Sequence, residues 1–239
     1  MKKKLLVSMI SIAMLSSLTA CGNTNTTTAQ PSQQETIEEV APQPEEKVTD
    51  LESALVAIET DFENTIQKIE TEFANTNKAI GDSYDGYIKN KQKLADWYAF
   101  LLEEEVQLFE RTKQNSIAYF KLIASTIDHG DDNAIDDALE EFYDRIYDDA
   151  MEEFYERIYD DLLGECYDYY YDGIVNDGYD TAPYEEWSDE LSDCYDMWSD
   201  TLSDVYDEWS DNLSDLYEYW SDVNSEFYDN NFDVDSIFE

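Results

Sequence analysis

Histidine, cysteine, glycine and proline are all scarce in this chain of 239 residues. It holds one histidine, three cysteines, four prolines and seven glycines. No set of Cys and His has the spacing of a metal site, and neither a glycine-rich phosphate loop nor a nucleophile elbow occurs. The lone histidine, His129, lies in a polar stretch and is interpreted as a turn residue. The sequence therefore predicts that the protein is not an enzyme and has no catalytic residue.

Positive charge is the second scarcity. The chain has 14 Lys and Arg against 58 Asp and Glu, a formal net charge of −44 at pH 7, and no basic residue follows Arg157. A surface of this sign repels nucleic acid and anionic lipid, and it favours cations and basic proteins as partners. Such a composition often indicates disorder. Here, regularly spaced tyrosines and tryptophans beyond residue 142 indicate a packed structure instead.

The amino terminus has the features of a secretory signal. Lysines at positions 2–4 precede an apolar run at 5–18, and small residues lead to Cys21. The segment Leu18-Thr19-Ala20-Cys21 resembles the lipobox of bacterial prolipoproteins. This resemblance covers the first 21 residues only. It implies a signal peptide at 1–20, lipidation of Cys21 with acyl chains such as palmitate, and anchoring on the extracytoplasmic side of the cell membrane.

The rest of the chain divides by composition. Residues 21–46 are predicted to be a flexible linker, because Thr, Gln, Pro and Glu dominate and large apolar residues are almost absent. With the signal removed, 11 basic and 58 acidic residues remain, a formal net charge of −47. The helical segments are expected at 47–128, 132–172 and 184–230, with a break at 173–183 and a tail at 231–239.

An eleven-residue repeat runs through the last segment. It reads YEEWSDELSDC, YDMWSDTLSDV and YDEWSDNLSDL from Tyr184 onward. Eleven residues make three helical turns, so each repeat position stays on one side of a helix. Tyr195, Trp198, Leu202 and Val205 are then expected to face a partner helix, and the aspartates are expected to face water.

The first segment carries the same period, as ETDFENTIQKI and ETEFANTNKAI show. Reading on in elevens predicts an apolar column of Leu51, Phe62, Phe73, Tyr84, Ala95, Val106 and Ile117. Apolar residues at intervals of three and four are typical of a helix that packs along one face. Strands are not expected, because alternation of apolar and polar residues is absent.

A middle block repeats at twelve residues, as LEEFYDRIYDDA, MEEFYERIYDDL and LGECYDYYYDGI. Twelve residues rotate an ideal helix about 120° beyond three turns. Either the helix presents a wide aromatic face, or a π-bulge absorbs one residue in each repeat. The broad arc spanned by Phe142, Tyr143, Ile146 and Tyr147 favours the wide face.

The fold class is predicted to be all-α. Breaks are expected at 81–86, at 128–132 and at 173–183, where glycine and proline interrupt the helical pattern. Their symmetry about the middle break favours a long antiparallel helical hairpin, a coiled coil built on the eleven-residue repeats. If the chain instead reverses at every break, the four pieces have the lengths of a four-helix bundle.

Carboxylates and cysteines supply the candidate sites. The last helix carries a face suited to diffuse binding of Ca²⁺ or Mg²⁺, formed by Asp196, Asp200, Asp204, Asp207, Asp211 and Asp215. Ligands on one straight face diverge, and residues 128–139 lack the glycine of a calcium loop, so no specific metal site and no cofactor is predicted. Cys166 and Cys194 flank the break at 173–183 and would form a disulfide if the chain folded back there. Two buried free thiols are the alternative.

Two functions fit these features. The first is a structural or protein-interaction role for a lipid-anchored acidic coiled coil at the bacterial cell envelope. Its partner would be a basic protein, an envelope polymer or a further copy of the chain bound through the aromatic stripe. The second is a lipoprotein that binds a divalent metal or a cationic small molecule. A concave pocket would distinguish them, because rods built on eleven-residue repeats generally lack one.

Overall fold

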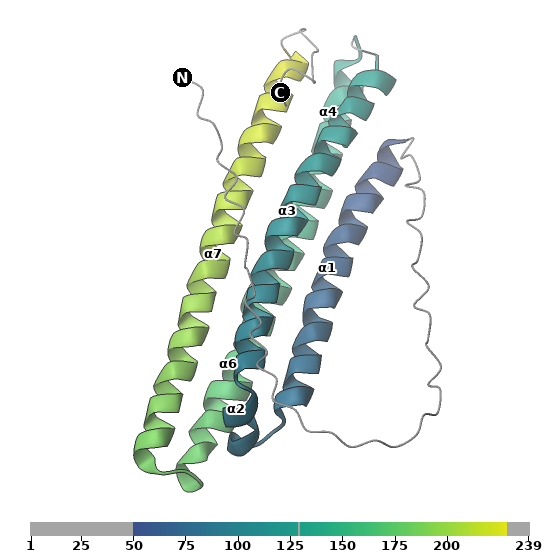
Figure 1. Ribbon diagram of the computed structural model, residues 1–239. Coiled ribbons are helices and arrows are strands. Elements are labelled where there is room, and N and C mark those ends of the chain that lie inside the picture. The colour runs from purple at the N-terminus through teal and green to yellow at the C-terminus, as the bar shows by residue number, and fades with distance from the viewer. Residues whose placement is uncertain (1–49, 129, 229–239) are drawn as a thin grey trace, which may run out of the picture. The chain divides into compact units, whose positions relative to one another are not determined.

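The protein is all-α, as the sequence predicts. The computed structural model describes residues 50–128 and 130–228, which form helices and turns with no strand (Figure 1). The predicted signal peptide at 1–20, the linker at 21–46, the lipidation site Cys21, the turn residue His129 and the tail at 231–239 lie outside the described residues. Among the described helices, none is both long enough and apolar enough to cross a membrane.

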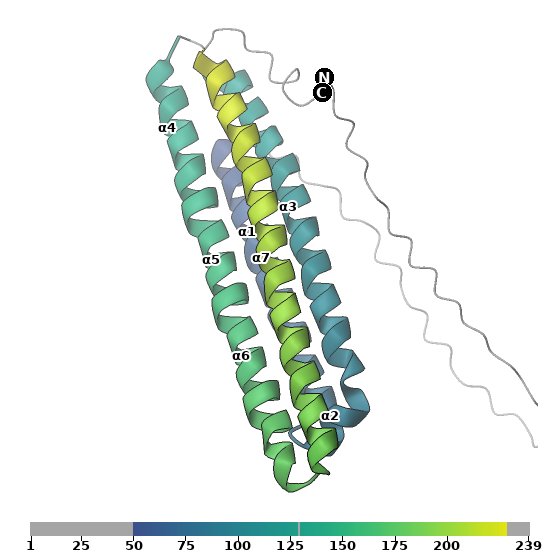
Figure 2. The same ribbon diagram turned by 90° about the vertical axis from the view of Figure 1, so that its left-hand side faces the viewer.

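The helices of residues 50–228 form four rods that lie side by side (Figures 1 and 2). The first rod is α1 (Leu51–Ile80), and the second comprises α2 (Tyr84–Asn90) and α3 (Gln92–Thr126). We use the term third rod for the continuous run of α4 (Asp132–Phe142), η1 (Tyr143–Met151), α5 (Glu152–Tyr155), η2 (Glu156–Leu162), α6 (Leu163–Tyr167) and η3 (Asp168–Val175). The short η4 (Gly178–Asp180) leads to the last rod, α7 (Tyr184–Tyr228).

The chain reverses direction between successive rods. α1 packs against α3 and the third rod, and α7 packs against the same two neighbours (Figure 2). This is the arrangement of the four-helix alternative. The two-arm hairpin that the sequence favoured is not what is observed, because the chain turns back at residues 81–83 and 176–183 instead of continuing through them. Each rod thus covers its apolar stripe with two neighbours, which a single partner helix could not do.

Side chains and glycines define the reversals. The α1 helix ends at Gly81, whose φ of +80° is a left-handed conformation that suits glycine and whose N–H donates to the Asn77 carbonyl at 2.8 Å. Ser83 then caps α2 by accepting a hydrogen bond from the Gly86 N–H at 3.2 Å. At the far end of the third rod, a Cβ on Gly178 would lie 2.4 Å from the ring of Tyr84, so only glycine allows this close approach.

The buried stripes show which repeat each rod follows. In α1 the core residues recur at eleven, as Leu55 and Ile66, or Ile58, Ile69 and Ile80. The expected eleven-residue column does not continue into α3, where Val106 is 44% exposed. The buried residues of α3 instead recur at seven, as Leu94, Leu101 and Leu108. A helix with a seven-residue stripe packs along one seam, as in coiled coils.

The third rod absorbs its twelve-residue repeat through π-helix. One π segment, η1, η2 or η3, falls in each repeat. As a result the buried residues recur every four positions: Phe142, Ile146, Ala150, Phe154, Ile158, Leu162, Cys166, Tyr170 and Ile174. Twelve residues thus complete three turns of about four residues each, and one side stays buried along the whole rod. The predicted wide aromatic face is therefore wrong, and the π-bulge alternative describes the rod.

Candidate functional site

The tyrosines of α7 lie at the surface, beside its buried stripe. Tyr195, Tyr206 and Tyr217 are 42%, 50% and 53% exposed, whereas Val205 is buried and Trp198 is half-buried. Tyr195 was expected to face a partner helix together with Trp198. It lies instead at the edge of the interface, where its ring contacts the third rod and part of its side chain stays exposed to water.

Stacked tyrosine pairs of the third rod meet these α7 tyrosines at a constant interval. The pairs are Tyr143 and Tyr147, Tyr155 and Tyr159, and Tyr167 and Tyr171, with ring centroids 4.7, 4.7 and 4.8 Å apart. The second member of each pair contacts an α7 tyrosine: Tyr147 with Tyr217 at 6.4 Å, Tyr159 with Tyr206 at 6.0 Å, and Tyr171 with Tyr195 at 5.4 Å. A step of twelve residues on the third rod therefore matches a step of eleven residues on α7. We call this row of exposed and half-buried rings the tyrosine groove.

The same twelve-to-eleven match appears where the third rod contacts α1. Each of its two arginines binds a pair of α1 glutamates: Arg145 binds Glu52 and Glu59, and Arg157 binds Glu63 and Glu70. The arginines are twelve residues apart, and the corresponding glutamates are eleven apart. Both guanidinium groups are thus directed to α1, so the last two positive charges of the sequence are paired away from the tyrosine groove.

Exposed carboxylates run along both rods that contribute to the tyrosine groove. The six α7 aspartates predicted to form an acidic face, from Asp196 to Asp215, are all exposed. The third rod adds a column of exposed acids at steps of four residues, interrupted at Gly164: Asp144, Asp148, Glu152, Glu156, Asp160, Asp168 and Asp172. Within the described ranges, no three His, Cys, Asp or Glu side chains are arranged to hold a metal ion. The acids therefore supply a negative surface, and no metal centre is seen in these parts of the chain.

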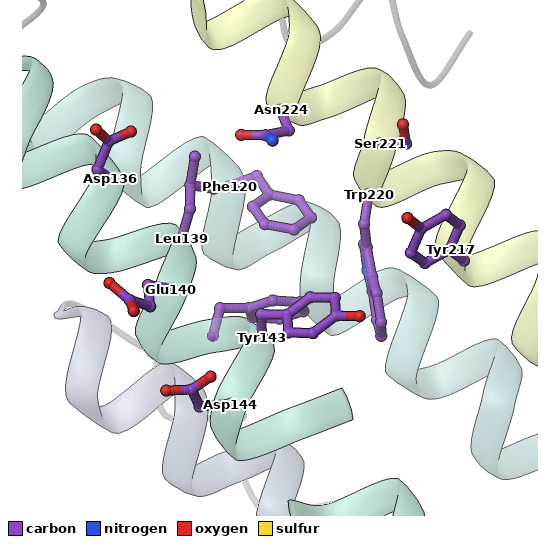
Figure 3. A pocket seen from close by; sticks show the side chains of 11 residues that line it. Phe120, Asp136, Leu139, Glu140, Tyr143, Asp144, Tyr217, Trp220, Ser221 and Asn224 are labelled. Atoms are coloured by element: carbon purple, nitrogen blue, oxygen red, sulfur yellow. The ribbon is translucent and has the colours of Figure 1, made fainter. Parts of the chain in front are cut away.

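A cavity of about 610 Å³ opens in the groove where α4 and η1 face α7 (Figure 3). Its walls are aromatic and acidic: Phe120, Asp136, Leu139, Glu140, Phe142, Tyr143, Asp144, Tyr217, Trp220, Ser221 and Asn224. We call it the aromatic cavity. One repeat further along the groove, a smaller cavity of about 360 Å³ lies between Tyr147, Tyr155 and Trp209. Cavities of this size are typical of small-molecule sites.

The phenol of Tyr143 in the aromatic cavity is uncharged at physiological pH, as a tyrosine ordinarily is. Partial burial, followed by the nearby Tyr147, Asp148 and Tyr217, raises its pKa above the ordinary value, which extends this neutral form to higher pH. Trp220 is 7% exposed, and its indole N–H has no hydrogen-bond partner.

Two cysteines, Cys166 on α6 and Cys194 on α7, lie in the described part of the chain, and both are buried. Both are free thiols there, which is the alternative that the sequence left open beside a disulfide. Burial raises the pKa of Cys166 to about 12, and its Sγ lies 3.1 Å from the Tyr98 hydroxyl. The chain nevertheless folds back at 176–183, which shows that aromatic packing can hold the reversal without a covalent link.

Glu105 is a buried acid that the sequence analysis missed. It is fully buried in α3, neither of its carboxylate oxygens has a hydrogen-bond partner, and burial raises its pKa to about 8. The signal was the spacing Leu101, Glu105, Leu108 and Thr112, which lies on the seven-residue stripe of α3. Reading this segment in elevens concealed it.

Comparisons with known proteins add no relative. No protein-family model matches the chain, and neither the search of curated proteins nor the search of solved structures found a match. The arguments for function therefore rest on the residues and their geometry.

Proposed function

We propose that this protein is a lipid-anchored lipoprotein on the extracytoplasmic side of a bacterial cell membrane. There its acidic helices, packed as a coiled coil, have a structural or protein-interaction role at the envelope. The linker at 21–46 would separate the helices from the lipid on Cys21. A basic protein or a cationic envelope polymer is the expected partner, and nucleic acid is not.

One observation carries this proposal: α7 and the third rod each carry a column of exposed carboxylates, and no basic residue follows Arg157. Like charges held in columns repel one another, which favours any partner that brings positive charge. A solvated face of this kind also attracts Ca²⁺ or Mg²⁺ loosely, without fixed ligands. The negative charge therefore favours positively charged partners. Added salt screens this attraction and should weaken their binding.

The lipid anchor is tested by labelling cells that express the chain with palmitate and separating membrane from soluble fractions. The expected result is a labelled, membrane-bound protein that Cys21→Ala converts to an unlabelled one. Equal labelling of the Cys21→Ala variant would reject the anchor.

The acidic face is tested by titrating the full chain with a lysine-rich peptide at low and high salt. The double variant Asp200→Asn/Asp211→Asn should bind several-fold more weakly at low salt. The matched control, Glu103→Gln/Glu110→Gln, removes the same charge from exposed positions of α3. Equal losses in both variants would show that net charge matters and the α7 face does not.

A second function, binding of a cationic ligand, is favoured by a separate observation. Bundles on eleven-residue repeats were expected to lack a concave pocket, yet the aromatic cavity has a volume of about 610 Å³. Titration with Ca²⁺ and Mg²⁺ tests whether the ligand is a divalent metal ion or a cationic small molecule. Weak, salt-sensitive binding without fixed stoichiometry is expected for the metals, because their carboxylate ligands diverge.

A further inference from the structure

We propose that the aromatic cavity is a binding site for an organic cation, an alkylated or quaternary ammonium group held against aromatic rings and attracted by carboxylates. This inference rests on the second function above, ligand binding, and is independent of the lipid anchor. It assigns a chemical class of ligand and a place for it.

Five aromatic rings line the cavity, and three of them, Phe120, Phe142 and Trp220, are buried. The ring centroid of Phe142 lies 4.8 Å from that of Phe120 and 5.1 Å from that of Trp220, so these three rings form one packed wall. Tyr143 and Tyr217 line the same cavity from the two rods, and both are more than a third exposed. In Figure 3 the rings of Phe120, Tyr143 and Trp220 lie between the helices, and Tyr217 lies on the α7 side. A cation near such ring faces is attracted by their quadrupoles.

Acids follow the other wall. Asp136, Glu140 and Asp144 line the cavity at steps of four residues along α4 and η1, as Figure 3 shows. Arg145 adjoins this row, but its guanidinium binds Glu52 and Glu59 of α1. The α7 side contributes only uncharged residues to the cavity. The walls together therefore favour a positively charged ligand.

The donor set fits an organic cation better than a metal ion. Calcium takes six to eight oxygen ligands at about 2.3–2.6 Å, arranged around the ion. Here the carboxylates form one row on one rod, and aromatic carbon makes up much of the remaining wall. An ammonium group with methyl substituents can contact the rings while its charge interacts with the acids at longer range.

The protein already makes this contact with its own lysines. The Lys113 ammonium lies 3.9 Å from the ring centroid of Tyr219 on α7, and Lys68 lies 5.3 Å from that of Phe100. Tyr219 belongs to the same repeat of α7 as Tyr217 and Trp220. An aromatic ring of this helix region thus already contacts an ammonium group, although Tyr219 is not among the residues that line the cavity.

The experiment compares two ligands of nearly the same shape and different charge. The full chain, purified in a non-ionic detergent, is titrated by calorimetry with choline and with 3,3-dimethylbutan-1-ol, which replaces the nitrogen by carbon. Choline should bind at least tenfold more tightly, because cation–π attraction and the carboxylates act only on the charged ligand. Equal affinities, or no binding of choline or of the peptide described below, would overturn the proposal.

A matched pair of variants locates the site. Tyr217→Leu should weaken choline binding about tenfold, whereas Tyr206→Leu removes the equivalent tyrosine one repeat away, outside the aromatic cavity, and should leave it unchanged. Both side chains are about half exposed, so neither change should unfold the protein, and circular dichroism checks this. Equal losses in both variants would contradict the site.

A peptide that carries trimethyllysine is the second probe, since the same cation can belong to a free molecule or to a protein side chain. If Tyr217→Leu abolishes binding of this peptide and Tyr206→Leu does not, the result supports the site and assigns the cation to a protein. Preference for choline would assign it to a small molecule.

Discussion

Glu105 allows a quantitative prediction about stability and pH. Its side chain is fully buried in α3, both carboxylate oxygens lack hydrogen-bond partners, and Glu208 of α7 adds repulsion to the effect of burial. These effects raise its pKa from 4.5 to about 8. We predict that the free energy of unfolding falls less between pH 5 and pH 9 in the Glu105→Gln variant than in the original protein.

The sign and size follow from proton binding. Below pH 4.5 Glu105 is protonated in both the folded and the unfolded chain. The contribution of this neutral side chain to the free energy of unfolding is therefore fully present there. Between pH 4.5 and about 8 the unfolded chain releases this proton and the folded chain keeps it, so stability falls as pH rises. At about 1.36 kcal/mol for each unit of pKa shift, the loss approaches about 5 kcal/mol as an upper limit. A glutamine cannot ionise and avoids this loss.

The assay is urea unfolding followed by circular dichroism at pH 5, 7 and 9. Glu105→Gln should differ little from the original protein at pH 5 and should be more stable by several kcal/mol at pH 9. The other acids change with pH in both proteins, so taking the difference between the two removes their effect. Glu103→Gln, an exposed neighbour on the same turn, is the control and should change stability by less than about 0.5 kcal/mol. A difference between Glu105→Gln and the original protein that does not grow with pH would refute the reasoning.

Three further predictions concern charge and thiols. Arg157→Met should lower the free energy of unfolding by about 1 kcal/mol at low salt and by less at high salt, because its ion pairs with Glu63 and Glu70 are partly exposed; urea unfolding at both salt concentrations measures this. Cys166 and Cys194 should resist alkylation at pH 8 in the folded protein and react in urea, as intact mass would show; fast alkylation without urea, or a bridged mass, would contradict their burial as free thiols. Helicity should rise from low to high salt as repulsion between carboxylates is screened, and a salt-independent dichroism spectrum would show that this repulsion is unimportant.

The sequence predicted the all-α class because the period at which apolar residues recur agrees, over long stretches, with the residues that are buried in the structure. In α1 the eleven-residue column through Phe62 and Phe73 is buried as expected. The aspartates from Asp196 to Asp215 are exposed as expected, since a charge without a partner stays in water. Local pattern was enough for these features.

Features that depend on two rods at once were harder to predict. The twelve-residue block allowed a wide face or a π-bulge, and only its neighbours decide between them, because Arg145 and Arg157 must meet glutamates spaced by eleven. Tyrosine is equally ambiguous: Tyr170 is buried and Tyr195 is largely exposed, although both recur at helical spacing. Its ring and hydroxyl suit both environments, so the packing of adjacent rods decides which one it occupies.

The aromatic cavity could not be predicted from either repeat alone. It forms where α3, α7 and the third rod meet, with Phe120, Tyr143 and Trp220 drawn from three rods. The spacing of residues along any single rod does not predict that these rings leave a cavity between them. The arrangement of the four rods creates the cavity and places a row of acids beside it.

The central claim is that this cavity binds an organic cation through its rings, and proton NMR of choline tests it most directly. Aromatic rings shift the resonance of methyl protons held over their faces to higher field. With the full chain, the N-methyl signal of choline should broaden and move upfield, and it should return toward its free position with Tyr217→Leu but not with Tyr206→Leu. An N-methyl signal that the full chain leaves unshifted and unbroadened would contradict the claim.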